Sequence, residues 1–409
     1  MRQILASIAI FLTGPLAALT ISTPVTVSIA DGANMSSCVA INEKGEAAVV
    51  WHSLYLHDGS LVASTLNRAK EWSPPHIIKE KYSLFLPKVK IDADGNVKCL
   101  WIDTIDNELF LQTAKKEKKE TWTFSSERLF ELPGAPSYTF LMEGDPNSAL
   151  TANQLLTKLI AEVTDVATPF VGSTSVSPKG KGFLVYCSVS SGYFWDSYSI
   201  KGRWLEEGAH SSGIADFAPG FSYFFFQNAV NDQDQIGVVW AKRDQNLQEY
   251  LEATVCVDGT WSEPVDLIAG KGMTEVKSKI DSEGNFLVVC TRKGKKEKNL
   301  FAAYKPKGQP WVHKTLFTSN SLDIKRFVVS CSKGHFVVVW DETAGREATV
   351  RGATLSTATE TWSPIRLSPP EFPCARPDVT FNEQGQGLIS WETIINGVWQ
   401  IQVAELSLD

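Results

Sequence analysis

Few side chains in this chain have the types and spacing that a reacting group requires. His210 and Ser211 are adjacent in a glycine-bounded segment, GAHSSG, and would place a base beside a nucleophile. Such pairs are normally brought together by the fold rather than by adjacency, and no G-x-S-x-G elbow is present. We therefore expect a solvated loop here and predict no catalytic residue.

Metal chemistry has one candidate segment. Asp92, Asp94 and Asn96 alternate as the first ligands of a calcium loop do, but other copies of the same segment read as hairpin turns. The six histidines show no H-E-x-x-H spacing, and no C-x-x-C pair is present. The seven cysteines lie mostly in apolar runs, so we expect buried thiols rather than a disulfide framework. No metal site and no cofactor are predicted.

Carboxylate pairs need a defined separation in space for acid–base work, and sequence alone does not supply it. Asp341 and Glu342 directly follow Trp340, and we expect them to lie in a loop.

Aromatic side chains are more informative. Eleven of the thirteen Trp belong to two repeating series, whereas Trp195 lies off the pattern in SSGYFWDSYS. A nearby segment, DFAPGFSYFFF, is also rich in aromatic residues. Flat rings beside polar groups stack on sugars or peptides, although a hydrophobic plug between irregular repeats is the alternative. The predicted ligand-binding residues are Tyr193, Phe194, Trp195, Tyr198, Phe221 and Tyr223.

The elements that must position these residues form a repeat. Strand-like runs end in a large residue every 50 or 51 residues, apart from one longer interval: Trp51, Trp101, Trp240, Cys290, Trp340 and Trp391. A second series follows in contexts such as TWSEP and TWSP: Trp72, Trp122, Trp204, Trp261, Trp311 and Trp362. A period near 50 is typical of propeller blades.

Each unit contains four strand-like segments. The turns before the second strand, such as NEKGE, DADGN, DSEGN and NEQGQ, carry the Asn, Asp and Gly of tight hairpins. Second strands such as AAVVW and FVVVW are apolar on successive residues, which indicates burial on both faces. Radially stacked sheets bury their strands in this way.

The number of units depends on the long interval between Trp122 and Trp204. Two compressed units fit it, one from Ser137 to Gly172 and one around GKGFLVYC, and predict eight four-stranded blades. Seven is the alternative if residues 137–172 are an insertion, and LTANQLLTKLIAEV also suits a short helix. The last unit lacks a fourth strand. Residues near Pro24 to Ile29 resemble the fourth strand of another unit. We therefore predict that the N-terminal strand completes the last blade and closes the ring.

The G-x-x-x-V-V-W and G-x-W-S-x-P patterns resemble the repeats of secreted bacterial β-propellers, loosely akin to the sialidase-like group. The resemblance implies a single all-β propeller. The chain lacks the Asp-box and the Arg-Ile-Pro motif of sialidases, so no catalytic residue is carried over.

The N-terminal segment predicts export. Met1 to Ser22 combines Arg2, an apolar run and small residues, as a secretory signal peptide does; an uncleaved anchor is the alternative. Neither Leu16-Ala17-Ala18 nor Thr20-Ile21-Ser22 is a clean cleavage motif. Residues 23–409 are then the propeller domain, and we predict no other transmembrane segment.

These features predict a monomer in the periplasm, on the cell surface or outside the cell. The net charge of -7 disfavours nucleic acid as a partner. The expected function is non-enzymatic, a binding or scaffold module for a protein or glycan. A divergent glycosidase or lyase is the alternative.

Overall fold

The computed structural model describes residues 19–408, apart from 29–32, 56–57, 81–86, 106–107, 118–120, 129–171, 177–181, 192–195, 205–211, 217–221, 245, 247, 295–297, 320–322, 345–346 and 370–371. The described residues form strands and no helix. Within this part of the chain, no helix is long and apolar enough to cross a membrane.

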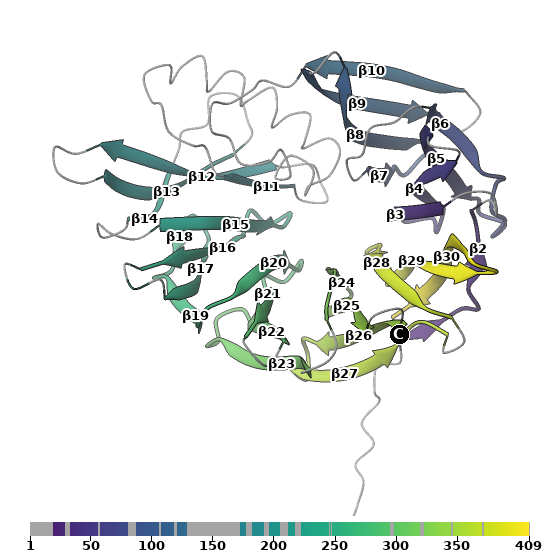
Figure 1. The fold of residues 1–409 in the computed structure, drawn as a ribbon. Helices are drawn as coiled ribbons and strands as arrows, with labels where there is room; N and C mark the ends of the chain where they lie inside the picture. The colour runs from purple at the N-terminus through teal and green to yellow at the C-terminus, as the bar shows by residue number, and fades with distance from the viewer. Residues whose placement is uncertain are drawn as a thin grey trace, which may run out of the picture.

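Seven antiparallel sheets are formed by the described residues, and Figure 1 shows them arranged radially around a central axis. Five of them have four strands, which pair in chain order. Their bounds are β3 (Ala33–Ile41), β4 (Ala47–Tyr55), β5 (Asp58–Leu66) and β6 (His76–Glu80); β7 (Lys88–Ile91), β8 (Val97–Ile105), β9 (Glu108–Lys116) and β10 (Trp122–Arg128); β11 (Gly172–Val176), β12 (Gly182–Ser191), β13 (Asp196–Trp204) and β14 (Ser212–Asp216); β20 (Met273–Ile280), β21 (Phe286–Lys293), β22 (Lys298–Lys305) and β23 (Val312–Ser319); and β24 (Phe327–Ser332), β25 (His335–Ala344), β26 (Glu347–Ser356) and β27 (Thr361–Arg366).

In the other two sheets, two short strands share the outermost position. The bounds are β15 (Ser222–Val230), β16 (Ile236–Arg243), β17 (Glu249–Val257), β18 (Thr260–Trp261) and β19 (Val265–Ala269); and β28 (Cys374–Phe381), β29 (Gln386–Ile395) and β30 (Val398–Ser407) with β1 (Thr20–Ile21) and β2 (Val25–Thr26). Each sheet is one blade, named below by its innermost strand.

The innermost strands contact one another in the order β11, β15, β20, β24, β28, β3 and β7. The predicted unit from residue 137 to 172 lies outside the described residues, except for Gly172, which begins β11. The segment considered for a short helix lies outside them as well.

The N-terminal segment completes the last blade, as predicted. Strand β2 pairs with β30 through Val25 opposite Val403 and Thr26 opposite Gln402. Strand β1, which lies inside the segment predicted as a leader, also pairs with β30. The first and last described segments of the chain therefore lie in one sheet, as the purple and yellow strands of Figure 1 show.

The hydrophobic core lies between neighbouring blades. In β4, Val49 packs toward the β28 blade and Val50 toward the β7 blade, so successive residues are buried on opposite faces. This confirms the interpretation of AAVVW as a strand covered on both sides. Trp51 in the middle of the same strand is fully buried, and truncating such a side chain costs about 3–5 kcal/mol.

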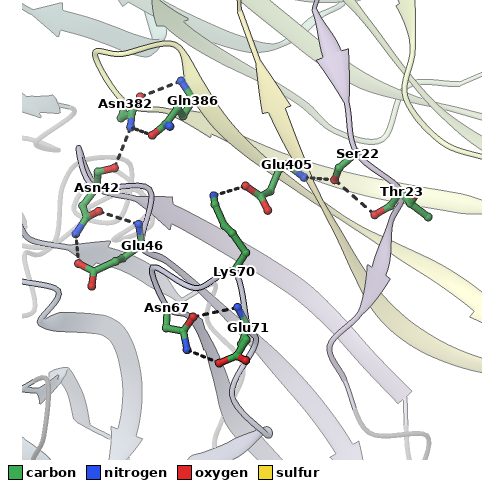
Figure 2. Close-up of polar contacts among 10 residues, drawn as sticks. All are labelled: Ser22, Thr23, Asn42, Glu46, Asn67, Lys70, Glu71, Asn382, Gln386 and Glu405. Carbon is green, nitrogen blue, oxygen red and sulfur yellow. Dashed lines mark hydrogen bonds and ion pairs between the residues drawn. The ribbon is translucent and has the colours of Figure 1, made fainter.

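The repeating Asn/Asp-Gly turns connect neighbouring blades. Nδ2 of Asn42 donates to the carbonyl oxygen of Asp92 at 2.8 Å, and Asn231 makes the same bond to Asp281. Nδ2 of Asn382 donates to the carbonyl oxygen of Asn42 at 2.9 Å, which connects the last blade to the first complete one (Figure 2). In the first two of these bonds the partners are 50 residues apart, which is the length of one repeat.

Two of these turns favour glycine for two reasons, its backbone conformation and the close packing around it. Gly284 has φ +93°, and a Cβ there would lie 2.3 Å from Oε1 of Gln235 in the preceding blade. Gly95 has φ +84°, and its Cβ would lie 2.9 Å from Oε2 of Glu46. Both the left-handed backbone and the packing between blades therefore exclude a side chain.

Candidate functional site

The propeller has two distinct ends. The hairpins between first and second strands lie at one, here called the turn end. The loops between second and third strands and the connections between blades lie at the other, here called the connection end.

The predicted aromatic surface is only partly within the described residues. Tyr193, Phe194, Trp195 and Phe221 lie outside them. Tyr198 is in β13 opposite Val189, and Tyr223 is in β15 opposite Lys242. Both tyrosines lie close to strand ends at the connection end, on neighbouring blades. Because the other four residues lie outside the described part of the chain, the aromatic surface stays a prediction. His210 and Ser211 also lie outside the described residues.

A network of charged residues at the connection end was not predicted from the sequence. It joins Asp341, whose side chain is fully buried, to the start of two innermost strands. Oδ1 of Asp341 accepts the backbone N–H groups of Lys325 (2.7 Å) and Arg326 (2.9 Å), and Oδ2 accepts that of Arg376 (3.0 Å). The expectation that Asp341 and Glu342 lie in a loop is wrong, because both belong to β25, which extends beyond Trp340.

The network continues into the β28 and β3 blades. Oε1 of Glu392 accepts the N–H of Ser36 at 2.7 Å, and Nη1 of Arg376 lies 3.3 Å from Oε2 of Glu392. Asp378 accepts the N–H of Val39 at 3.0 Å and lies 3.4 Å from Nη2 of Arg326. We call Arg326, Asp341, Arg376, Asp378 and Glu392 the connection-end network.

Backbone conformation places Arg376 in this network. Its φ of +49° is in the left-handed region, within an irregularity of β28 between Ala375 and Asp378. Ser36 occupies the equivalent irregularity of β3 with φ +58°. In both cases the N–H donates to the acidic residue that follows the repeat Trp of the preceding blade, Asp341 or Glu392. A non-glycine residue in this conformation costs of order 1 kcal/mol, which these charge-assisted hydrogen bonds offset.

Burial changes the titration of groups around the network. The pKa of Glu392 is raised because the carboxyl group is desolvated, although the Ser36 N–H and the Arg376 guanidinium partly oppose that shift. Burial, with Asp378 nearby, raises the pKa of the Cys38 thiol to about 12. Cys38 is therefore protonated at neutral pH and is not a nucleophile. Five cysteines are buried, as expected, namely Cys38, Cys99, Cys256, Cys290 and Cys374, and Cys331 is half-buried.

Three arginine–glutamate pairs at the connection end share one asymmetry: the carboxylate is buried and the guanidinium is exposed. The pair Arg326–Asp378 does not share it, since 21% and 10% of its side chains are exposed. In the pair Arg376–Glu392, 48% of the arginine side chain is exposed against 3% of the glutamate. Arg351–Glu342 shows 46% against 9%. Arg243–Glu249 shows 41% against 8%.

Each buried carboxylate also accepts other hydrogen bonds from the fold. Glu342 accepts the indole N–H of Trp340 at 3.1 Å. Glu249 accepts the N–H groups of Gly272 and Met273 in the next blade, at 2.8 and 3.0 Å. Both carboxylates are turned away from solvent, and that of Glu249 also connects two neighbouring blades. The guanidinium groups, with five N–H donors each, are the exposed parts of these pairs.

Asp92 forms a hairpin turn. Its Oδ1 accepts the N–H groups of Asp94 and Asn96, each at 2.9 Å, and its Oδ2 accepts Nδ2 of Asn96 at 2.8 Å. These hydrogen bonds hold the pKa of Asp92 below its ordinary value, although desolvation opposes them. Among the described residues, no group of three or more His, Cys, Asp or Glu side chains could hold a metal ion.

Comparisons with known proteins agree with the architecture. No protein-family profile matches the chain, and no curated protein does. A crystal structure of the polysaccharide lyase Uly1 is similar at TM-score 0.50 and 9% identity, over 93% of this chain and 90% of that one. The β-propeller domain of the Trilobed protease from Pyrococcus furiosus matches at TM-score 0.45 and 12% identity, over 93% and 97%. The Hadza microbial sialidase Hz136 matches at TM-score 0.37 and 10% identity, over 94% and 68%.

At these identities the similarity concerns the fold alone. Together with the radial sheets of Figure 1, the likeness defines the class of protein: this chain is an all-β propeller.

Proposed function

We propose that the protein is an exported binding module that captures a ligand at its connection end and does not turn it over. The observation that carries this proposal is the asymmetry of the ion pairs. A carboxyl group that acts as a general acid or base must come within hydrogen-bond reach of the substrate. Here Asp341, Asp378 and Glu392 are buried, and each accepts a backbone N–H group from an adjacent blade.

The exposed guanidinium groups favour a ligand rich in hydrogen-bond acceptors. Arginine binds carboxylate and sulfate groups through its planar fork of donors. A glycan that carries such groups, or an acidic protein surface, matches this end of the ring. Tyr198, near the start of β13, and Tyr223, near the start of β15, lie on neighbouring blades at the same end, and ring stacking would add to the affinity of a glycan.

A binding assay with matched variants tests the proposal. The purified protein is titrated with polygalacturonate, and with dextran as an uncharged polymer. We expect Arg376→Gln to weaken the binding of polygalacturonate about 10- to 150-fold, because one charge-assisted pair contributes about 1.5–3 kcal/mol. Arg351→Gln is expected to act in the same direction.

The chain offers a close control at the turn end. Arg68 lies 3.2 Å from Glu46, with 56% of the arginine side chain exposed against 5% of the glutamate. Arg68→Gln therefore leaves a buried carboxylate without its ion pair, as Arg376→Gln does, but at the opposite end of the ring. Equal loss of affinity in both variants would refute binding at the connection end.

The aromatic part of the proposal is tested with Trp195→Ala. We expect this variant to lose binding to the ligands retained by the wild-type protein in glycan-array and pull-down screens. Unchanged profiles would remove the aromatic residues from the binding surface.

Glu392 supports a second candidate function, a carbohydrate-active enzyme. Glycosidases use one carboxyl group of raised pKa as a general acid, and the pKa of Glu392 is raised. If the network were catalytic, polygalacturonate would be shortened on incubation and Glu392→Gln would abolish that change. The binding proposal predicts polymer of unchanged length with both proteins.

A further inference from the structure

Residues 19–28 form a clasp along the outer edge of the last blade, bonded to β30 through residues 20–22 and 25–28. At the end of this segment, the N–H of Val27 donates to the carbonyl oxygen of Ile401 at 3.1 Å, and the N–H of Ile401 donates to Oγ of Ser28 at 2.9 Å. Val27 itself is buried between the last blade and the β3 blade.

The first four residues of this clasp are built into the fold as firmly as the rest. Thr20 pairs with Ser407 and Ile21 with Leu406. The N–H of Ser22 donates to the carbonyl oxygen of Glu405, and the N–H of Glu405 donates to Oγ of Ser22, both at 2.9 Å (Figure 2). Leu19 packs against the core cluster between the β24 and β28 blades.

The same edge is joined to the first complete blade. The side chain of Lys70, in the loop after β5, forms an ion pair with Glu405, as Figure 2 shows. Loss of residues 19–22 would remove the partners of Glu405, Leu406 and Ser407 on one side of β30. An uncovered strand edge is also a site for pairing with other chains.

The sequence offers two cleavage positions, neither of which has a clean motif, and the structure distinguishes them. Cleavage after Ser22 would discard Leu19, β1 and both hydrogen bonds to the Glu405 backbone. Cleavage after Ala18 would retain all of them, and Ala18 is the small residue that the position before the cut requires.

We propose that the leader is removed by hydrolysis of the Ala18–Leu19 peptide bond, so that the mature chain begins at Leu19. Water supplies the hydroxyl group to the carbonyl carbon of Ala18 and a proton to the nitrogen of Leu19, and no other co-reactant is needed. This inference rests on the proposed export. It places the boundary of the leader four residues before the one expected from the sequence.

The test is to express the full chain in a bacterial host and determine the N-terminus of the exported protein by intact mass and N-terminal sequencing. We expect Leu19. An exported chain that begins at Thr23, or that retains Met1, would overturn the inference. A chain that retains Met1 and stays in the cytoplasm would instead contradict export itself, so the two failures are distinguishable.

Two leader variants sharpen this test. Ala18→Phe places a large residue directly before the proposed cut, and we expect the uncleaved chain to accumulate. Ala17→Phe changes the neighbouring position, which tolerates any residue in the small-x-small pattern, and should be processed normally. Normal processing of Ala18→Phe would contradict cleavage at this bond.

The contribution of residues 19–22 to stability is measured separately, in an experiment that does not depend on export. Chains that begin at Leu19 and at Thr23 are purified and their thermal unfolding is compared. Loss of two hydrogen bonds and of Leu19 packing predicts a Tm lower by about 3 °C for the shorter chain. Equal Tm values would show that residues 19–22 are not part of the clasp.

Discussion

Replacing Asp341 with Asn exchanges one carboxylate oxygen for an NH2 group in the most deeply buried part of the connection-end network. The wild-type carboxylate accepts three backbone N–H groups, at 2.7, 2.9 and 3.0 Å. An Asn side chain keeps one acceptor oxygen, which can still serve Lys325 and Arg326. Its NH2 group then faces the N–H of Arg376, so a donor opposes a donor.

The magnitude of this change follows from the contacts. One charge-assisted hydrogen bond is lost, the other two weaken because the acceptor is neutral, and a buried N–H is left without an acceptor. Each of these effects is worth about 1–3 kcal/mol, and they are not additive, so we expect Asp341→Asn to lower the free energy of unfolding by about 2–4 kcal/mol.

Equilibrium unfolding in urea measures this loss, with Asp94→Asn as the control. Asp94 is an exposed acid in a hairpin turn, so its replacement removes the same charge without a buried partner. We expect a change within about 0.5 kcal/mol for the control. If Asp341→Asn were as stable as Asp94→Asn, the network would not hold the blades together and the account of its carboxylates would be wrong.

Two further predictions concern the turn end and the pH dependence of stability. Gly284→Ala should lower the free energy of unfolding by about 2–4 kcal/mol, because a Cβ meets Gln235 in the preceding blade and φ is positive. Gly259→Ala also has positive φ but no atom within 4 Å, so it should cost only about 1 kcal/mol; equal losses would contradict the packing argument. The folded-state pKa of Glu392 is raised, so its contribution to stability is present below the unfolded pKa and is lost as pH rises through the folded value. Unfolding at pH 4 and pH 7 should therefore show Glu392→Gln gaining stability relative to wild type at the higher pH, and a change of the opposite sign would contradict the burial argument.

The architecture was predictable because it repeats. Trp51 and Trp101 lie at equivalent buried positions in the middle of second strands, and their spacing of 50 residues is also that of the turns that contact each other between blades. The pairing of the segment near Val25 with β30 was also predictable, because the last unit lacks a strand that this segment supplies. Local patterns suffice where each unit resembles its neighbour.

The connection-end network was not predictable in the same way. Arg326 and Asp378 are 52 residues apart, and Glu392 meets Ser36 from the other end of the chain. These contacts depend on how three blades are stacked and on irregularities in β3 and β28, which no periodicity reveals. One signal was present in the sequence: an acidic residue follows the repeat Trp in two successive units, as Asp341 and Glu392.

The most direct test of the central claim is amide hydrogen exchange with and without a bound ligand, since it reports which end of the ring is covered. The ligand retained in the polygalacturonate or glycan-array experiments is the probe. Binding at the connection end predicts slower exchange around residues 323–328 and 374–378 and no change in the turns at 42–46 and 382–386. Protection confined to those turns, with unchanged exchange around Arg376, would contradict it.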